Sequence, residues 1–213
     1  MTKSDLAVLI VILLIISATV GVFVYSKHKQ NKNAFIYHGA HGDYRIDLYK
    51  SGNQTDYYVY AVTQNQLYLI PLRKTPQEVE PIFLEPDLLS KLQRPSGTEK
   101  VYITQDYETG NKTGQLSFIA SQDIGKILGR ASYGIYKLDV QGALTSSTER
   151  SLALDVPEIT CTNVSSTTSV IYLKLEDENK VYSDHGCIIV EGKDADGLIL
   201  AATKLAYYFL GVF

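Results

Sequence analysis

The chain of 213 residues contains no tryptophan, one methionine and only two cysteines. Two cysteines are too few for a small scaffold held together by several disulfides. The chain also lacks an excess of basic residues, since 20 Lys and Arg stand against 23 Asp and Glu, which excludes a generally basic nucleic-acid-binding protein. A hydrophobic content of 45% excludes disorder over the whole chain. The length suits one ordinary domain with an appendage.

The beginning of the chain lacks charge over a long stretch, because Leu6 to Tyr25 contains 20 residues and no Asp, Glu, Lys or Arg. A helix of this length spans about 30 Å, the thickness of the hydrocarbon core of a bilayer. The alternative is a cleaved signal peptide, whose apolar core is about 7–15 residues long. The longer stretch here predicts an uncleaved transmembrane signal-anchor over residues 1–25, in contact with membrane lipid, followed by a polar linker over residues 26–33.

Two signals disagree about the side of the membrane on which the rest of the chain lies. Three lysines follow the apolar stretch and only Lys3 precedes it, which favours the cytoplasm. Three N-x-S/T sequons, at Asn53, Asn111 and Asn163, and the short flank before the apolar stretch favour the outside. Residues 1–32 carry four Lys and one Asp, a net charge of +3, and the remainder carries −6. We predict a single-pass protein of the cell membrane with an extracytoplasmic, acidic domain.

Residues 34–213 predict a mixed α/β globular domain that begins with a β-rich meander. Alternating or apolar runs at Tyr44–Tyr49, Asp56–Val62 and Gln66–Leu72 are typical of strands, and turn residues separate them. Seven of the 16 tyrosines lie between Tyr37 and Tyr68. Tyrosines suit a half-buried sheet, and they would equally suit a recognition face. After several prolines, a short helix is expected at Asp87–Gln93.

The second half of the domain predicts one βαβ unit followed by a β-β-β-α arrangement. The βαβ unit consists of a strand at Val101–Thr104, a polar loop at 105–114, a helix at Gln115–Leu128 and a parallel strand at Gly134–Val140. The later strands are expected at Ser169–Leu175, Lys180–Ser183 and Cys187–Val190, and the last helix at Ala195–Leu210 with Asp194 as its N-cap and Gly211 after its end.

Three segments contain residue types found in ligand sites, but their patterns favour structural roles. The turn Gly192–Gly197 and the loop Thr109–Gly114 lie before expected helices, yet neither has the spacing of a phosphate-binding loop. The segment His38–Asp43 contains two histidines and an aspartate within a Gly-rich turn. No catalytic constellation is visible, and the sequence predicts no cofactor and no metal.

The two cysteines, Cys161 and Cys187, lie 26 residues apart on or near expected strands. Outside the cytoplasm, neighbouring strands would allow them to form a disulfide. In the cytoplasm, two buried free thiols would be expected instead. The pairing prediction therefore depends on the side of the membrane.

The last two thirds of the chain resemble uncharacterised archaeal proteins with a single membrane anchor. The resemblance covers most of residues 70–213 and is carried by the following segments: Thr75–Glu80, Ile124–Leu128, Cys161–Asn163, Val170–Leu173, Gly186–Lys193 and Lys204–Gly211. These are packing motifs, so the resemblance implies a surface or membrane protein and implies no active site.

Three functions are compatible with this sequence. The leading hypothesis is a non-enzymatic envelope protein that binds a protein partner or holds a complex together at the membrane, without nucleic acid. The second is a pilin-like filament subunit, although no basic-Gly processing site precedes the apolar stretch. The third is an enzyme or small-ligand binder that uses the loops between strands and helices.

Overall fold

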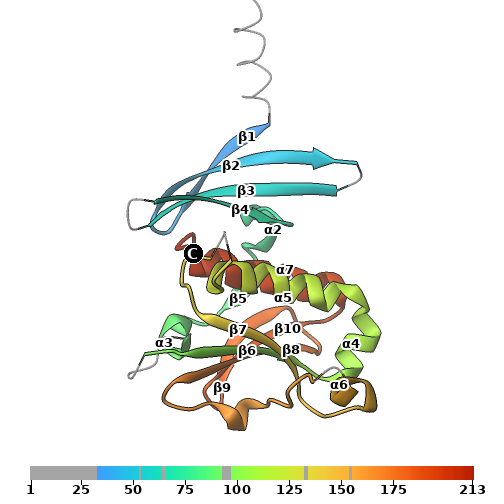
Figure 1. Ribbon diagram of the computed structural model, residues 1–213. Helices are drawn as coiled ribbons and strands as arrows, with labels where there is room; N and C mark the ends of the chain where they lie inside the picture. Colours follow the sequence, from blue (N-terminus) through green and yellow to red (C-terminus); the bar gives the residue numbers. More distant parts are fainter. Residues whose placement is uncertain (1–32, 53, 64–65, 93–96, 132–133, 154) are drawn as a thin grey trace, which may run out of the picture.

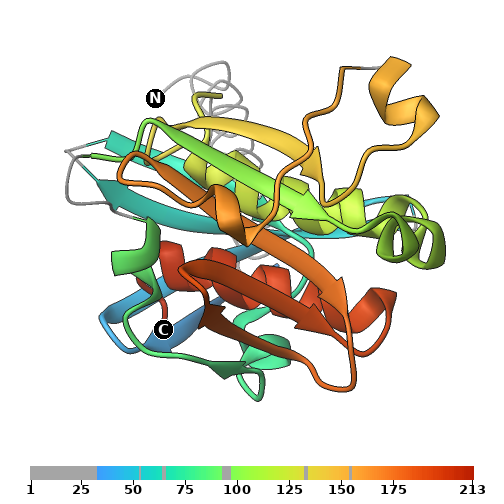
Figure 2. The ribbon, with the colours of Figure 1, turned by 90° about the horizontal axis from the view of Figure 1, so that it is seen from below.

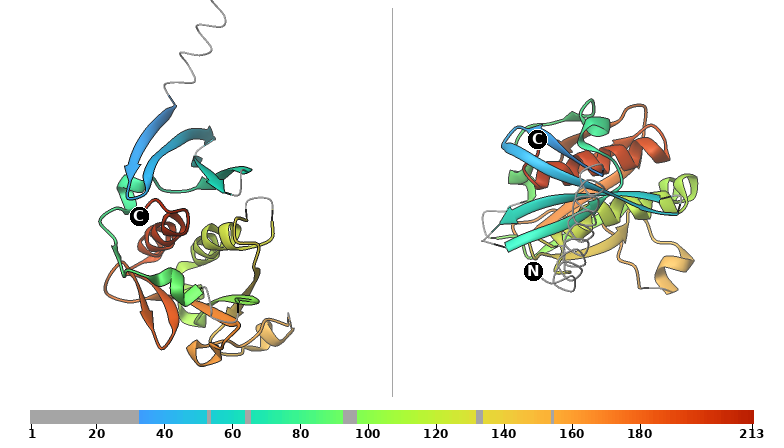
Figure 3. Two further views of the ribbon diagram at one scale, coloured as in Figure 1. Left: turned by 90° about the vertical axis from the view of Figure 1, so that its left-hand side faces the viewer. Right: turned by 90° about the horizontal axis from the view of Figure 1, so that it is seen from above.

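The computed structural model describes residues 33–52, 54–63, 66–92, 97–131, 134–153 and 155–213. Two β-sheets enclose a layer of two helices, α5 (Gln115–Leu128) and α7 (Ala195–Phe209) (Figures 1 and 3). The arrangement is a mixed α/β fold, as the sequence predicts. The predicted anchor over residues 1–25, including Leu6 and Tyr25, and nearly all of the linker lie outside the described residues. Among the helices that are described, none combines the length and hydropathy needed to cross a bilayer.

The first sheet is an antiparallel meander, which confirms the prediction for residues 34–72. Its strand order is β1-β2-β3-β4, and we call it sheet A. Its strands are β1 (Ala34–Gly39), β2 (Gly42–Ser51), β3 (Gln54–Thr63) and β4 (Gln66–Leu72). Alternate side chains of these strands, among them Ile46, Val59 and Ile70, are fully buried against the helices. The opposite face of sheet A is turned away from the helices (Figure 3).

The second sheet, sheet B, has the order β5-β9-β10-β8-β6-β7. Its strands are β5 (Phe83–Leu84), β6 (Lys100–Gln105), β7 (Asp139–Leu144), β8 (Thr168–Leu175), β9 (Lys180–Asp184) and β10 (Cys187–Gly192). Strands β6, β7, β8 and β10 are parallel, whereas β9 is antiparallel to β10. The parallel pair β6–β7 and the C-terminal β8-β9-β10-α7 succession confirm the two predicted motifs. Figure 2 shows β7 at one edge of the sheet.

Two predictions within the βαβ unit are wrong. The expected polar loop at 105–114 contains a helix, α4 (Tyr107–Thr113), which begins where the Asp106 side chain accepts a hydrogen bond from the Thr109 backbone N–H. The strand expected at Gly134–Val140 begins only at Asp139. Residues 135–138, which were expected in this strand, instead form hydrogen bonds with the end of α5. Ile135 N donates to Ile127 O at 2.8 Å, and Leu138 N donates to Leu128 O at 2.8 Å.

Helix α7 lies at the centre of the molecule, and its apolar side chains belong to one buried core together with side chains of both sheets. Asp194 caps its first turn by accepting a hydrogen bond from Gly197 N at 2.7 Å, and Gly211 follows its end with φ +78°, as predicted. The end of β10 comes so close that a Cβ on Gly192 would lie 2.3 Å from Leu198 N. Leu198, Ala202 and Leu205 have no exposed surface. An apolar helix therefore joins the two sheets into one core.

Short helices complete the described structure: α2 (Pro76–Val79), α3 (Leu88–Leu92), α6 (Glu149–Ala153) and the 3₁₀ helix η1 (Cys161–Asn163). Helix α3 lies inside the predicted range Asp87–Gln93. Helix α6 projects from the body of the molecule near the end of β7 (Figure 2). Cys161, expected on a β-like stretch, lies in η1 instead, because Thr160 and Asn163 form a reciprocal cap around that turn.

Candidate functional site

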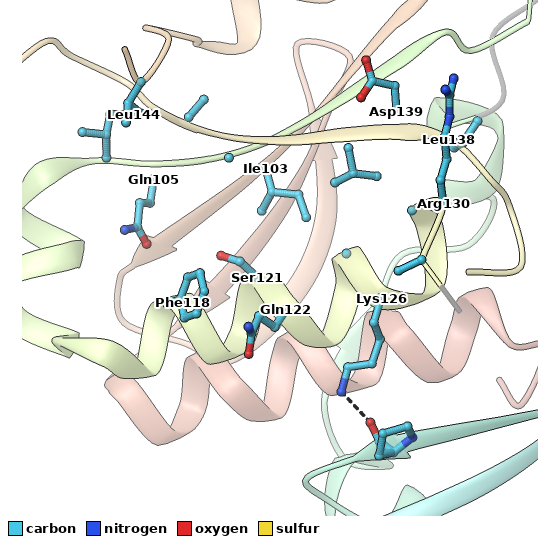
Figure 4. Close-up of a pocket in the computed structure, with 18 residues that line it drawn as sticks. Ile103, Gln105, Phe118, Ser121, Gln122, Lys126, Arg130, Leu138, Asp139 and Leu144 are labelled. Atoms are coloured by element: carbon cyan, nitrogen blue, oxygen red, sulfur yellow. Dashed lines mark hydrogen bonds between the residues drawn. The ribbon is translucent and has the colours of Figure 1, made fainter. Parts of the chain in front are cut away.

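A groove of about 930 Å³ lies between α5 and the edge strand β7 (Figure 4). It extends from the carboxyl ends of β6 and β7, at Gln105 and Leu144, to the end of α5, at Arg130. Its lining is mainly apolar, with Ile103 and Leu138 on the strand side and Phe118 on the helix side. The Phe118 ring is 62% exposed, so much of its apolar surface remains in solvent.

The sequence of α5 explains why the groove forms between this helix and β7. Ser121, Gly125 and Gly129 recur every four residues, so they share the face of the helix that is turned toward β7. A Cβ on Gly125 would lie 3.7 Å from Ile103 Cδ1 and 3.9 Å from a Val140 methyl, which shows how closely helix and strand approach. On the strand side, a Cβ on Gly142 would meet no atom within 4 Å. Small residues thus leave the groove open along both walls.

The outer edge of β7 offers backbone groups for pairing. Leu144 N donates to Pro157 O at 3.1 Å and Leu144 O accepts from Ile159 N at 2.8 Å, so the backbone of Leu144 points away from β6. Because backbone direction alternates along a strand, the N–H and C=O groups of Val140 and Gly142 point to the same side. Within the described part of the chain, these four groups have no hydrogen-bond partner. Beside the groove, the edge is therefore unpaired at Val140 and Gly142, whereas at Leu144 it pairs with residues 157–159.

The charged side chains at the far end of the groove have different degrees of pairing. Lys126 Nζ lies 2.7 Å from a carboxylate oxygen of Asp123 and also donates to the Pro71 carbonyl, the contact dashed in Figure 4. Burial raises the pKa of Asp123, and Lys126 only partly opposes this effect. Asp139 Oδ2 lies 3.6 Å from Lys100 Nζ. Arg130 is exposed and forms no ion pair with any residue that the structure describes.

Gln105, the last residue of β6, provides a polar group at the other end. Its side chain points from β6 toward α5 near Phe118 (Figure 4). Its carbonyl oxygen Oε1 is buried and has no hydrogen-bond partner among the described residues. Leaving a buried acceptor unpaired costs free energy of about 1–3 kcal/mol. A ligand with a donor at this place would recover part of that free energy.

The outer face of sheet B carries a polar cluster around Glu191. Its carboxylate lies 3.4 Å from Lys174 Nζ and 3.3 Å from Lys180 Nζ, and it accepts a hydrogen bond of 3.0 Å from the Tyr182 hydroxyl. Burial alone would raise the pKa of Glu191, but these three partners outweigh burial and lower it. Because each charge already has a partner, we interpret the cluster as a stabilising element of the sheet.

The two cysteines lie on the same outer face of sheet B. The structure joins Cys161 in η1 to Cys187 at the start of β10, with Cα atoms 5.4 Å apart. Cys187 is fully buried beside Ile159 and Ile189. The bond therefore attaches the segment around η1 to the sheet. Whether it forms in the cell stays a prediction, since it depends on the compartment.

The sequons occupy different environments. Asn111 is exposed on α4, but the Thr113 hydroxyl of its sequon is buried and donates to Thr109 O at 2.7 Å. Asn163 is exposed, and its side-chain oxygen accepts a hydrogen bond of 2.8 Å from Thr160 N. Asn53 lies outside the described residues. Glycosylation at these three positions stays a prediction.

The segments with ligand-like residue types take up structural positions. His38 Nδ1 lies 2.6 Å from Asp43 Oδ1 across the β1–β2 hairpin, with both side chains largely in solvent. The described residues contain no group of three or more His, Cys, Asp or Glu side chains that could hold a metal ion. The turn before α7 is a helix cap, and the segment Thr109–Gly114 lies mostly in α4.

The groove was not foreseen from the sequence, although signals for it were present. The four-residue spacing of Ser121, Gly125 and Gly129 marks a helix face without large side chains, and Gly142 interrupts a strand. These signals remained ambiguous because the strand was expected too early in the chain. The site depends on two elements, α5 and β7, whose distance only the tertiary structure defines.

No family model, no curated protein and no solved structure matches the chain. The resemblance to archaeal anchored proteins stays a prediction.

Proposed function

We propose that the protein is a single-pass, membrane-anchored envelope protein whose extracytoplasmic domain binds an extended segment of a partner protein. The segment adds to β7 as a further strand of sheet B, and its alternate side chains enter the groove against α5. The role is binding or scaffolding without catalysis. The observation that carries the proposal is that the outward backbone groups of Val140 and Gly142 on the edge strand β7 are unpaired directly beside an apolar groove.

An unpaired strand edge alone would be ordinary, because every open sheet has two. At β7 the edge coincides with a groove into which side chains of an added strand would point. Recognition of this type uses backbone hydrogen bonds for affinity and side-chain pockets for specificity. The N–H and C=O groups of Val140 and Gly142 would supply the hydrogen bonds, and Ile103, Phe118 and Leu138 would supply the apolar contacts.

The lining also indicates the chemistry of the bound segment. Successive side chains of a strand alternate between its two faces, so every second residue would enter the groove. Those residues should be apolar along the middle of the groove. Beside Arg130, whose guanidinium has no ion-pair partner in the described structure, an acidic residue would be favoured. A short sequence of alternating apolar residues followed by an acidic residue fits this site.

The test uses the full chain in lipid nanodiscs and a phage-displayed library of random nine-residue peptides. We expect enrichment of peptides with alternating apolar residues, with binding measured by fluorescence polarisation of a labelled selected peptide. Gly142→Pro removes the outward N–H of Gly142 but no hydrogen bond to β6, so it should weaken binding by ~10-fold or more, in line with the loss of 1.4 kcal/mol or more.

Gly142→Ala is the matched control, because it keeps the N–H group and its Cβ meets no atom within 4 Å. This variant should bind the selected peptide nearly as well as the parent protein. Methylation of the peptide backbone nitrogens that pair with β7 should abolish binding. Failure to enrich any peptide, or equal binding by the proline and alanine variants, would show that β7 does not capture a strand.

A further inference from the structure

The outer face of sheet A carries a second concentration of exposed apolar and aromatic side chains. In the pairing of the four strands, this face consists of the residues that alternate with the buried ones. Five large hydrophobic residues of this face are exposed: Ile36 (52%), Tyr49 (59%), Val62 (73%), Leu67 (56%) and Leu69 (37%). Tyr58 and Tyr60 lie between them on β3. We call this set of residues the outer face of sheet A.

The charged side chains of this face form one internal ion pair, between Arg45 and Asp47, and include Asp56, whose carboxylate accepts a hydrogen bond of 2.7 Å from Gln54 Nε2. Arg45 Nε donates to Asp47 Oδ1 at 2.8 Å, and the Arg45 guanidinium lies 5.4 Å from the centre of the Tyr60 ring. The Tyr60 hydroxyl donates to Asp47 Oδ2 at 2.7 Å. A carboxylate held in this way brings no uncompensated charge to an apolar environment. The face is therefore mainly apolar and tyrosine-rich, with its arginine paired to Asp47 and the Asp56 carboxylate near one end of the strands.

The short segment between the apolar stretch and sheet A limits how far sheet A can lie from the proposed membrane anchor. Sheet A begins at Ala34, and residues 26–33 alone separate it from Tyr25. Eight residues span at most ~28 Å when fully extended. Figure 1 shows that sheet A is one of the two outer layers and that β1 begins on its side away from α5 and α7. Sheet B lies beyond the helix layer and is therefore farther from the point of attachment.

We propose that the outer face of sheet A lies against the lipid surface, with its tyrosines and aliphatic side chains at the level of the headgroups. Tyrosine is enriched at membrane–water interfaces because its ring is apolar and its hydroxyl is polar. The inference rests on the proposed anchor, which holds sheet A near the bilayer. It adds an orientation to that function, because sheet A then separates the bilayer from the helix layer and sheet B, whose edge strand forms the peptide groove.

The absence of tryptophan provides a direct test, since one introduced tryptophan is the sole indole of the chain. Val62→Trp places it on the outer face of sheet A, and Leu152→Trp places it on α6, where Leu152 is 68% exposed. Both full-length variants are reconstituted into phosphatidylcholine vesicles, with and without bromine on the acyl chains. We expect blue-shifted emission and strong bromine quenching for Val62→Trp, and solvent-like emission without quenching for Leu152→Trp.

Every other result would contradict either the proposed orientation of sheet A or the proposed anchor. Solvent-like emission from Val62→Trp, or equal quenching of the two variants, would overturn the proposal. Blue-shifted emission without bromine quenching would also overturn it, because a second copy of the chain would then cover the face. Protein that does not float with the vesicles would instead refute the anchor. Failure of the anchor is thus distinguished from failure of the orientation. Circular dichroism of both variants verifies that each has the fold of the parent protein.

Discussion

Lys204 is a charged residue in an apolar position at the centre of α7. Its side chain is 5% exposed, and Nζ lies 3.3 Å from the centre of the Phe213 ring and 3.2 Å from the Glu80 carbonyl oxygen, to which it donates. Burial lowers the pKa of Lys204 to about 8, and the Glu80 carboxylate opposes this effect only in part. The long aliphatic stem suits the core, whereas the ammonium group opposes burial.

This lowered pKa predicts how stability depends on pH. The native state binds the Lys204 proton less tightly than the unfolded state does, so the free energy of unfolding should rise as pH increases from about 8 toward the unfolded pKa. Lys204→Met should remove that rise and stabilise the protein at pH 7 by ~1–2 kcal/mol. The measurement is urea unfolding of the full chain in detergent across this pH range.

The control for this experiment is Lys193→Met, which alters an exposed lysine just before α7. It should leave both the stability and its pH dependence unchanged. If Lys204→Met retains the pH dependence of the parent protein, the ammonium group of Lys204 is not responsible for it.

At the scale of elements, the segment around η1 packs on the outer face of sheet B through few apolar contacts. Ile159 and Val164 join Val170 and Ile189 in a small cluster that is separate from the main core. The Cys161–Cys187 bond closes a loop with a sequence separation of 26 residues across this cluster. A loop of that size predicts stabilisation of about 3 kcal/mol through restriction of the unfolded chain.

Replacement of both cysteines, Cys161→Ala with Cys187→Ala, should therefore lower the free energy of unfolding by ~3 kcal/mol. Amide hydrogen exchange should rise first at residues 157–168, since the rest of sheet B keeps its ladder. Unfolding under reducing conditions should bring the parent protein to nearly the stability of the variant. Equal stability of the oxidised parent and the variant would show that the bond adds nothing.

Local sequence patterns predicted the helices and strands whose ends are marked by clear signals. They failed for α4 and for the start of β7, where the local residues favour another structure. The range Gln115–Leu128 was predicted for α5 because its apolar residues recur at helical spacing and Gly129 follows it. Helix α4 was missed because Gly110, Asn111 and Gly114 are typical of a loop. Tertiary contacts overrode that preference, since Thr109 and Thr113 are buried there. Strand β7 was displaced because the end of α5 holds residues 135–138.

At the scale of the whole molecule, the side of the membrane on which we propose that the domain lies would determine both whether the disulfide forms and whether a protein partner can reach the groove. The acidic domain, with net charge −6 over residues 33–213, would be repelled by the anionic lipids of a cytoplasmic leaflet. An oxidising compartment would permit the bond between Cys161 and Cys187 that the structure shows. Both features would be expected of the extracytoplasmic domain that we propose.

Labelling of intact cells with a membrane-impermeant maleimide tests this topology. We expect no labelling before reduction and labelling after an impermeant reductant, because Cys161 is only partly buried and becomes a free thiol. The double Cys→Ala variant should give no signal in any condition, since the chain has no other cysteine. Labelling that requires cell lysis but no reductant would place the domain in the cytoplasm with free thiols.

The sequence by itself determined the mixed α/β class, the antiparallel meander and the succession of elements in the last third, because periodicity and turn residues act over short distances. It also carries the argument for the anchor, through a charge-free stretch of 20 residues. The tertiary structure alone decided that α7 lies between two sheets, that the small residues of α5 line the same groove as Gly142, and that β7 is an edge strand unpaired at Val140 and Gly142. Such features depend on distances between segments far apart in the chain, to which local patterns are insensitive.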